Sequence, residues 1–112
     1  MSIEFNGKTI ETDKNGYLVN SEDWSKELAE HLARADGLTL TPKHWDLIEF
    51  LRDEYFNNSQ NQPNTRNIVK AMGEKWGTMV QQKDIYDLFP KDPSKQGGRI
   101  AGLPESRRKG GY

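Results

Sequence analysis

The clearest structural signal in the sequence is residues 41–57, which read TPKHWDLIEFLRDEYFN. Threonine is a favoured N-cap, and proline at the first helical position loses nothing because that N–H has no partner inside the helix. The apolar positions that recur at helical spacing are Trp45, Ile48, Leu51 and Tyr55, with Leu47 beside them. We therefore predict a helix over 42–57 with one buried face.

On either side of this stretch we expect further helices over about 21–36, 65–76 and 82–89. Their apolar stripes are Trp24, Leu28 and Leu32; Ile68, Val69, Met72 and Trp76; and Ile85, Leu88 and Phe89. Gly37 is placed to end the first of them. Gly73 interrupts the second, at about 1 kcal/mol relative to alanine.

The first twenty residues predict an N-terminal hairpin over 3–19. Asn6-Gly7, a strong two-residue turn signal, lies between the alternating segments 3–5 and 8–10, and a second turn follows at 13–16. With 112 residues the chain is one small domain. The predicted fold class is mainly α with a small N-terminal β-hairpin.

Beyond Pro90 the helical periodicity stops and glycine and proline become frequent, so we predict a body over 1–90 and a flexible, glycine-rich arm over 91–112. The arm holds six basic residues against two acidic ones, about +4 in a chain of net charge −1. Such an arm suits an acidic protein surface or a phosphate backbone. It is equally consistent with a solvated tail.

The sequence contains no cysteine. Disulfides, thiolate metal sites, iron–sulfur clusters and cysteine nucleophiles are therefore excluded. With only His31 and His44, a histidine-rich metal site is not expected either, and we predict no cofactor and no enzyme activity. The chain has no apolar run that would span a membrane, and its first residues lack the pattern of a signal peptide, so we expect a cytoplasmic protein.

Three groups of segments, in order, carry a resemblance to a known family. They are DKNGYL at 13–18 with Asp23-Trp24; LTPKHW at 40–45 with FLRDEY at 50–55; and IYDLFP at 85–90 with PSKQ at 93–96 and RIAGLP at 99–104. Together they resemble the DsrC/TusE family of small bacterial sulfur-relay proteins.

The resemblance implies a helical bundle whose flexible C-terminal arm ends in a cysteine at the next-to-last position, often with a second cysteine after the Lys-Gln segment. In the family, the terminal thiol carries a persulfide toward a tRNA-thiolating enzyme or inserts into dissimilatory sulfite reductase. Both branches stay open here. Gly98 and Gly111 occupy the two cysteine positions of this chain, so it has no catalytic residue for sulfur transfer.

We expect the arm to bind a protein partner of a sulfur-relay or dissimilatory sulfite reductase system. The predicted partner-binding residues are Lys95, Gln96, Arg99, Arg107, Arg108, Lys109, Gly110, Gly111 and Tyr112. Arg66 matches a family arginine and is a candidate for orienting the arm, or else a plain surface charge. We expect the three tryptophans to pack in the core and the chain to be a monomer.

Two alternatives remain open. The first is a sulfur carrier whose cysteines have been replaced in this sequence. The second is a DNA-binding regulator in which helices 65–76 and 82–89 form a helix-turn-helix. The second of these helices carries one lysine against two aspartates, and phosphate repulsion would oppose docking, so nucleic acid is not the expected partner.

Overall fold

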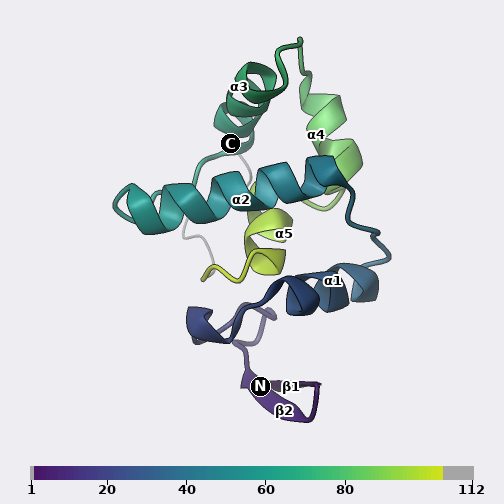
Figure 1. The fold of residues 1–112 in the computed structure, drawn as a ribbon, viewed down its shortest axis with the longest axis vertical. Coiled ribbons are helices and arrows are strands. Elements are labelled where there is room, and N and C mark those ends of the chain that lie inside the picture. Colours follow the sequence, from purple (N-terminus) through teal and green to yellow (C-terminus); the bar gives the residue numbers. More distant parts are fainter. Residues whose placement is uncertain (1, 105–112) are drawn as a thin grey trace.

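The computed structural model describes residues 2–104 of the chain. The elements in chain order are β1 (Ser2–Phe5), β2 (Lys8–Glu11), a 3-10 helix η1 (Ser21–Asp23), α1 (Lys26–Ala35), α2 (Pro42–Asn57), α3 (Thr65–Trp76), α4 (Gln82–Leu88) and α5 (Pro93–Ile100). The hairpin lies at one end of the long axis and α3 and α4 at the other, with α2 crossing between them (Figure 1). The predicted class, mainly α with a small N-terminal hairpin, is confirmed.

Helix α2 has the predicted bounds and supplies the centre of the core. Thr41 is its N-cap, and the Thr41 N–H donates to Nδ1 of His44 at 3.0 Å. Leu47, Ile48 and Leu51 are at most 2% exposed. Trp45 and Tyr55, placed in the buried stripe from the sequence, are half-buried and pack against the edge of the core.

The hairpin is shorter than predicted. Ile3 pairs with Ile10, and the turn residues Asn6 and Gly7 both have positive φ, as a type I′ turn requires. Beyond β2, residues 17–19 form no strand, and only a single bridge joins Thr12 to Leu18.

The second turn, predicted at 13–16, is present as a tight turn over residues 13–17. The Asp13 carboxylate accepts the N–H groups of Asn15 and Tyr17, and the Tyr17 hydroxyl donates to the carbonyl oxygen of Lys95 at 3.3 Å. Tyr17 is thereby directed toward α5 rather than along the hairpin.

The helix predicted over 21–36 is divided in two. Asn20 caps η1, and Ser25 caps α1 by accepting the N–H of Leu28 at 3.1 Å. Two caps within six residues leave Trp24 between them in an extended conformation. Its indole Nε1 donates to the carbonyl oxygen of Ile100 at 2.8 Å, a long-range contact that the apolar stripe of the sequence does not encode.

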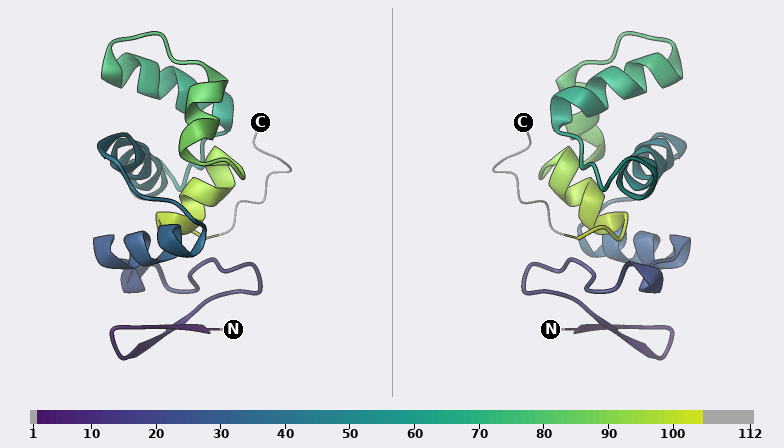
Figure 2. Two further views of the ribbon diagram at one scale, coloured as in Figure 1. Left: turned by 90° about the vertical axis from the view of Figure 1, so that its right-hand side faces the viewer. Right: turned by 90° about the vertical axis from the view of Figure 1, so that its left-hand side faces the viewer.

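The predicted boundary between body and arm at residue 91 needs correction. Residues 93–100 form α5, and Ile100, Ala101 and Leu103 are at most 1% exposed. Figure 2 shows α5 packed inside the bundle, where it contacts α1, α2, α3 and α4. The body therefore continues to residue 104, and residues 105–112 of the predicted arm lie outside the described part of the chain.

The glycines that suggested flexibility instead allow close helix packing. A Cβ on Gly97 would lie 3.0 Å from Cδ1 of Leu51 and 3.4 Å from Cδ2 of Leu47, so α5 and α2 approach too closely for a side chain. Asp92 caps α5 by accepting the N–H groups of Ser94 and Lys95. Along residues 2–104 no helix is both long and apolar enough to cross a membrane.

Candidate functional site

Three side chains from separate parts of the body hold the backbone that leads to the C-terminus. Trp24 Nε1 donates to the carbonyl oxygen of Ile100 at 2.8 Å, Arg52 Nη1 to that of Ala101 at 2.6 Å, and Gln62 Nε2 to that of Pro104 at 2.9 Å. We call this arrangement the exit clamp. It fixes the backbone of residues 100–104, after which eight further residues follow in the sequence.

Arg52 is the centre of the exit clamp. Its guanidinium lies 3.9 Å from the centre of the Trp24 ring and 4.9 Å from that of Phe56, and burial lowers its pKa. Ring faces stabilise a partly desolvated cation in the absence of a carboxylate. Gly102 completes the contact: it has φ +77°, and a Cβ there would lie 2.4 Å from Cδ1 of Trp24, so only glycine fits.

Three of the predicted partner-binding residues lie on α5. Lys95, Gln96 and Arg99 line a hollow of about 360 Å³ between α5 and the 13–17 turn. We call it the α5 hollow; its other lining residues are Asn15, Tyr17, Lys91 and Asp92. The other predicted residues, Arg107, Arg108, Lys109, Gly110, Gly111 and Tyr112, lie outside the described residues.

Gln96 and Arg99 tie α5 to the end of α1. The Asp36 carboxylate accepts from Gln96 Nε2 at 3.0 Å and forms an ion pair with Arg99. Gln96 is 5% exposed, and its Oε1 accepts the N–H of Lys91 at 3.0 Å. Gln96 and Arg99, predicted from the sequence to bind a partner, thus have structural contacts within the body. The other two cations of the α5 hollow, Lys91 and Lys95, form no ion pair within residues 2–104.

Gly98, which the family resemblance predicts to stand at one cysteine position, differs from its neighbour Gly97. It is buried in α5, yet an added Cβ would meet no heavy atom within 4 Å. The fold itself therefore does not require glycine at this position. Gly111, predicted to stand at the other cysteine position, lies outside the described residues.

Arg66 is exposed on the first turn of α3. No hydrogen bond or ion pair within residues 2–104 engages it, so its role in orienting the arm stays a prediction.

Trp76 packs half-buried at the core edge, donates from Nε1 to Asp46 Oδ2 at 2.8 Å, and has Lys43 Nζ 5.0 Å from its ring centre.

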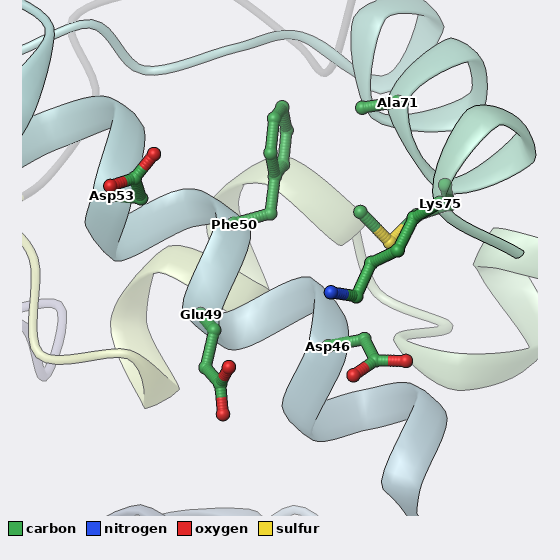
Figure 3. A pocket seen from close by; sticks show the side chains of 7 residues that line it. Asp46, Glu49, Phe50, Asp53, Ala71 and Lys75 are labelled. Atoms are coloured by element: carbon green, nitrogen blue, oxygen red, sulfur yellow. The ribbon is translucent and has the colours of Figure 1, made fainter.

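A second hollow, of about 440 Å³, lies between α2 and α3 and was not identified from the sequence. Asp46, Glu49 and Asp53 line it from α2, and Lys75 extends toward them from α3 (Figure 3). The sequence signal that could have identified this hollow is the spacing of Asp46, Glu49 and Asp53, three and four residues apart, which places them on one face of the helix. Among the described residues no group of three or more His, Cys, Asp or Glu side chains is placed to hold a metal ion.

Helices α3 and α4 follow one another as the two helices of a helix-turn-helix do, but α4 lacks the basic surface of a DNA-reading helix. On α4, Lys83 pairs with Asp87 at 3.8 Å, and Asp84 accepts the N–H of Gln81 at the start of its own helix. A DNA-reading helix presents donors to base edges and cations to phosphates. Helix α4 presents two carboxylates and one paired lysine.

The fold and site define a class: a small helical protein without a thiol nucleophile, whose last described residues, 100–104, are held by side chains of the body. A family model described as "DsrC like protein" matches residues 4–108. A protein named Sulfurtransferase TusE from Yersinia pestis is 48% identical over 106 residues, covering 92% of this chain and 94% of that protein.

Solved structures give the same answer. The chain is similar to DsrC of Allochromatium vinosum, with 42% identity, a TM-score of 0.85 and coverage of 97% of this chain and 99% of that one. It is also similar to the oxidized gamma-subunit of the dissimilatory sulfite reductase (DsrC) from Archaeoglobus fulgidus, with 34% identity, a TM-score of 0.86 and the same coverage. The chain belongs to the DsrC/TusE family of sulfur-relay proteins, and it is a member without cysteine.

Proposed function

We propose that this chain docks on a protein of a sulfur-relay or sulfite-reductase system without carrying sulfur, and that it regulates or competes with carriers that do. The observation that carries the proposal is the complete absence of cysteine in a chain that otherwise keeps the family body along its length.

The chemistry of the side chains supports a binding role. A persulfide needs a thiolate to form, and the serine hydroxyls and methionine thioethers of this chain supply none. Relatives are named Sulfurtransferase TusE and gamma-subunit of dissimilatory sulfite reductase, which gives the class of partner. What is left of the family's activity, once transfer is removed, is recognition of that partner.

The exit clamp supports docking by the end of the chain. Eight residues follow Pro104, and a chain of that length reaches at most about 26–29 Å when extended. The carbonyl oxygen of Pro104, just before these residues, accepts a hydrogen bond from Gln62. Binding by the end of the chain therefore loses less conformational entropy than it would for an arm that begins at residue 91. Arg107, Arg108 and Lys109 would supply contacts to an acidic partner surface.

One observation favours a second candidate, a carrier whose cysteines have been replaced in this sequence. The space around Gly98 accepts a side chain, as it would if cysteine were the residue for which this helix was shaped. A cysteine codon for position 98 or 111 in the encoding gene would establish the carrier. Glycine codons at both positions would exclude it.

The test of docking is a titration of purified dissimilatory sulfite reductase, and separately of a tRNA-thiolating enzyme, with the full chain at low salt. We expect saturable binding to one of them, and displacement of a cysteine-containing family member from it. A variant ending at Pro104 keeps the described body and should bind more weakly. Absence of binding to both, or a sulfur adduct on this chain in mass spectra during turnover, would contradict the proposal.

A further inference from the structure

We infer that the α5 hollow binds an acidic segment of the protein partner, through Lys91 and Lys95. This inference rests on the proposed function for the identity of the partner and adds the chemistry of what the partner presents. It assigns a contact to the body of the chain, separate from the residues after Pro104.

Among the described residues 2–104, Lys91 and Lys95 form no ion pair. Within residues 2–104 neither ammonium lies within 4.0 Å of a carboxylate, whereas Arg99, the third cation of the α5 hollow, is paired with Asp36. Lys91 is exposed and Lys95 half-buried. The two lysines are four residues apart, and both side chains line the α5 hollow.

The lining of the α5 hollow holds three cationic side chains against one carboxylate, that of Asp92. The Oδ1 atom of Asp92 accepts the N–H groups of Ser94 and Lys95 at 3.0 and 3.2 Å, so that carboxylate acts as the cap of α5. Asp36 is occupied by Gln96 and Arg99. A carboxylate brought by another chain therefore meets two lysines that form no ion pair within residues 2–104.

The walls of the hollow are held in place from both sides. Tyr17 is 7% exposed and its hydroxyl donates to the Lys95 carbonyl oxygen. Gly16, at φ +88°, brings its backbone against the Arg99 side chain, since a Cβ there would lie 3.5 Å from Cδ of Arg99. A site formed in advance binds a flexible segment at a smaller entropic loss.

The charge of the rest of the molecule favours a short acidic peptide over a nucleic acid. The residues before Lys91 carry a net charge near −5, and the α2–α3 hollow contains three carboxylates against one lysine. A long polyanion would be repelled by these surfaces while it contacted α5. A volume of about 360 Å³ holds a few side chains and not a duplex.

The first experiment uses a synthetic Glu/Asp pentapeptide, inorganic phosphate and a single-stranded RNA 12-mer as probes of the full chain by calorimetry and NMR. The pentapeptide should bind saturably with shifts at the α5 hollow. The double variant Lys91→Glu with Lys95→Glu should bind it on the order of tenfold more weakly. The matched control is Lys26→Glu with Lys70→Glu, which makes the same charge change at two exposed lysines outside the hollow and should bind as the unchanged chain does. Equal weakening in both variants, tighter binding of the RNA, or the same saturable shifts with phosphate alone would overturn the inference.

The second experiment repeats the partner titration with both double variants. Loss of partner binding with the α5-hollow variant alone supports the inference. Partner binding that this variant leaves unchanged overturns the inference but leaves the proposed function standing. A third outcome is that the α5 hollow binds the pentapeptide while the chain binds neither dissimilatory sulfite reductase nor the tRNA-thiolating enzyme. That outcome supports an acidic ligand for the hollow and contradicts the proposed function.

Discussion

Arg52, near the middle of α2, donates from Nη1 to the carbonyl oxygen of Ala101 at 2.6 Å, forty-nine residues further along the chain. The same guanidinium lies over the ring of Trp24 at 3.9 Å. One side chain thus joins the longest helix, the segment before α1 and the end of α5. It therefore holds the backbone at the end of α5 against the rest of the body.

Replacing Arg52 by lysine should destabilise the fold although the charge is kept. A lysine ammonium lacks the planar group that stacks on Trp24 while donating to Ala101. We therefore expect the free energy of unfolding to fall by about 1–2 kcal/mol. Chemical denaturation of the full chain measures it. The exposed Arg34 provides the control, since Arg34→Lys should change the stability by less than about 0.5 kcal/mol. Equal stabilities for both variants would show that the exit clamp contributes nothing.

Gly102→Ala should be far more damaging than Gly7→Ala. Both glycines have similar positive φ, +77° and +74°, so the backbone strain, about 1 kcal/mol, is shared. Only at Gly102 would the new Cβ overlap the Trp24 side chain, at 2.4 Å, whereas nothing lies within 4 Å at Gly7. We expect a loss of about 3 kcal/mol or more at Gly102, as for overpacking combined with strain. Thermal unfolding of the two variants, run side by side, tests the difference; similar midpoints would refute the overlap.

Gly97 and Gly98 provide a second matched pair. Both lie inside α5, where alanine is favoured over glycine by about 1 kcal/mol. Gly98→Ala should therefore stabilise the chain or leave it unchanged, because its Cβ enters open space. Gly97→Ala should destabilise it, because Leu51 lies 3.0 Å from the new atom and belongs to the core of α2. Urea midpoints that move in the same direction for both would contradict the packing described for α5.

These glycines also show what the sequence could predict and what it could not. Helix α2 was predicted with its observed bounds because its signals are local: a threonine cap, a proline and a stripe of apolar residues within one turn of each other. Helix α5 was missed because two glycines lower local helix propensity, while the reason for them, the leucines of α2, lies more than forty residues away.

The site was predictable to the same extent. Lys95, Gln96 and Arg99 were identified from the family resemblance, but as members of a flexible arm. The placement of Gln96 and Arg99 depends on Asp36 at the end of α1, which no local pattern marks. The exit clamp was missed for the same reason, since Trp24, Arg52 and Gln62 act on carbonyl groups remote in the sequence.

The last prediction concerns the acid stability of the chain. His44 links the start of α2 to the end of α4: Nδ1 accepts the N–H of Thr41, so Nε2 carries the proton and donates to the carbonyl oxygen of Leu88 at 2.9 Å. Burial lowers the pKa of His44, and the contact with the Leu88 carbonyl offsets this only in part. A proton added at Nδ1 would replace an acceptor by a donor that faces the Thr41 N–H.

The unfolded chain therefore binds a proton at His44 more readily than the folded chain does. The stabilisation from neutral His44 is complete above the unfolded value of about 6.5, and it is lost progressively as the pH falls below that value. The free energy of unfolding, measured between pH 7.5 and 5, should fall more steeply for the unchanged chain than for His44→Gln, which has no proton to gain in this range. The matched variant His31→Gln removes a histidine that lies beside the Phe5 ring and should keep the steep dependence. Parallel curves for the unchanged chain and His44→Gln would mean that the protonation of His44 is not linked to the α2–α4 contact.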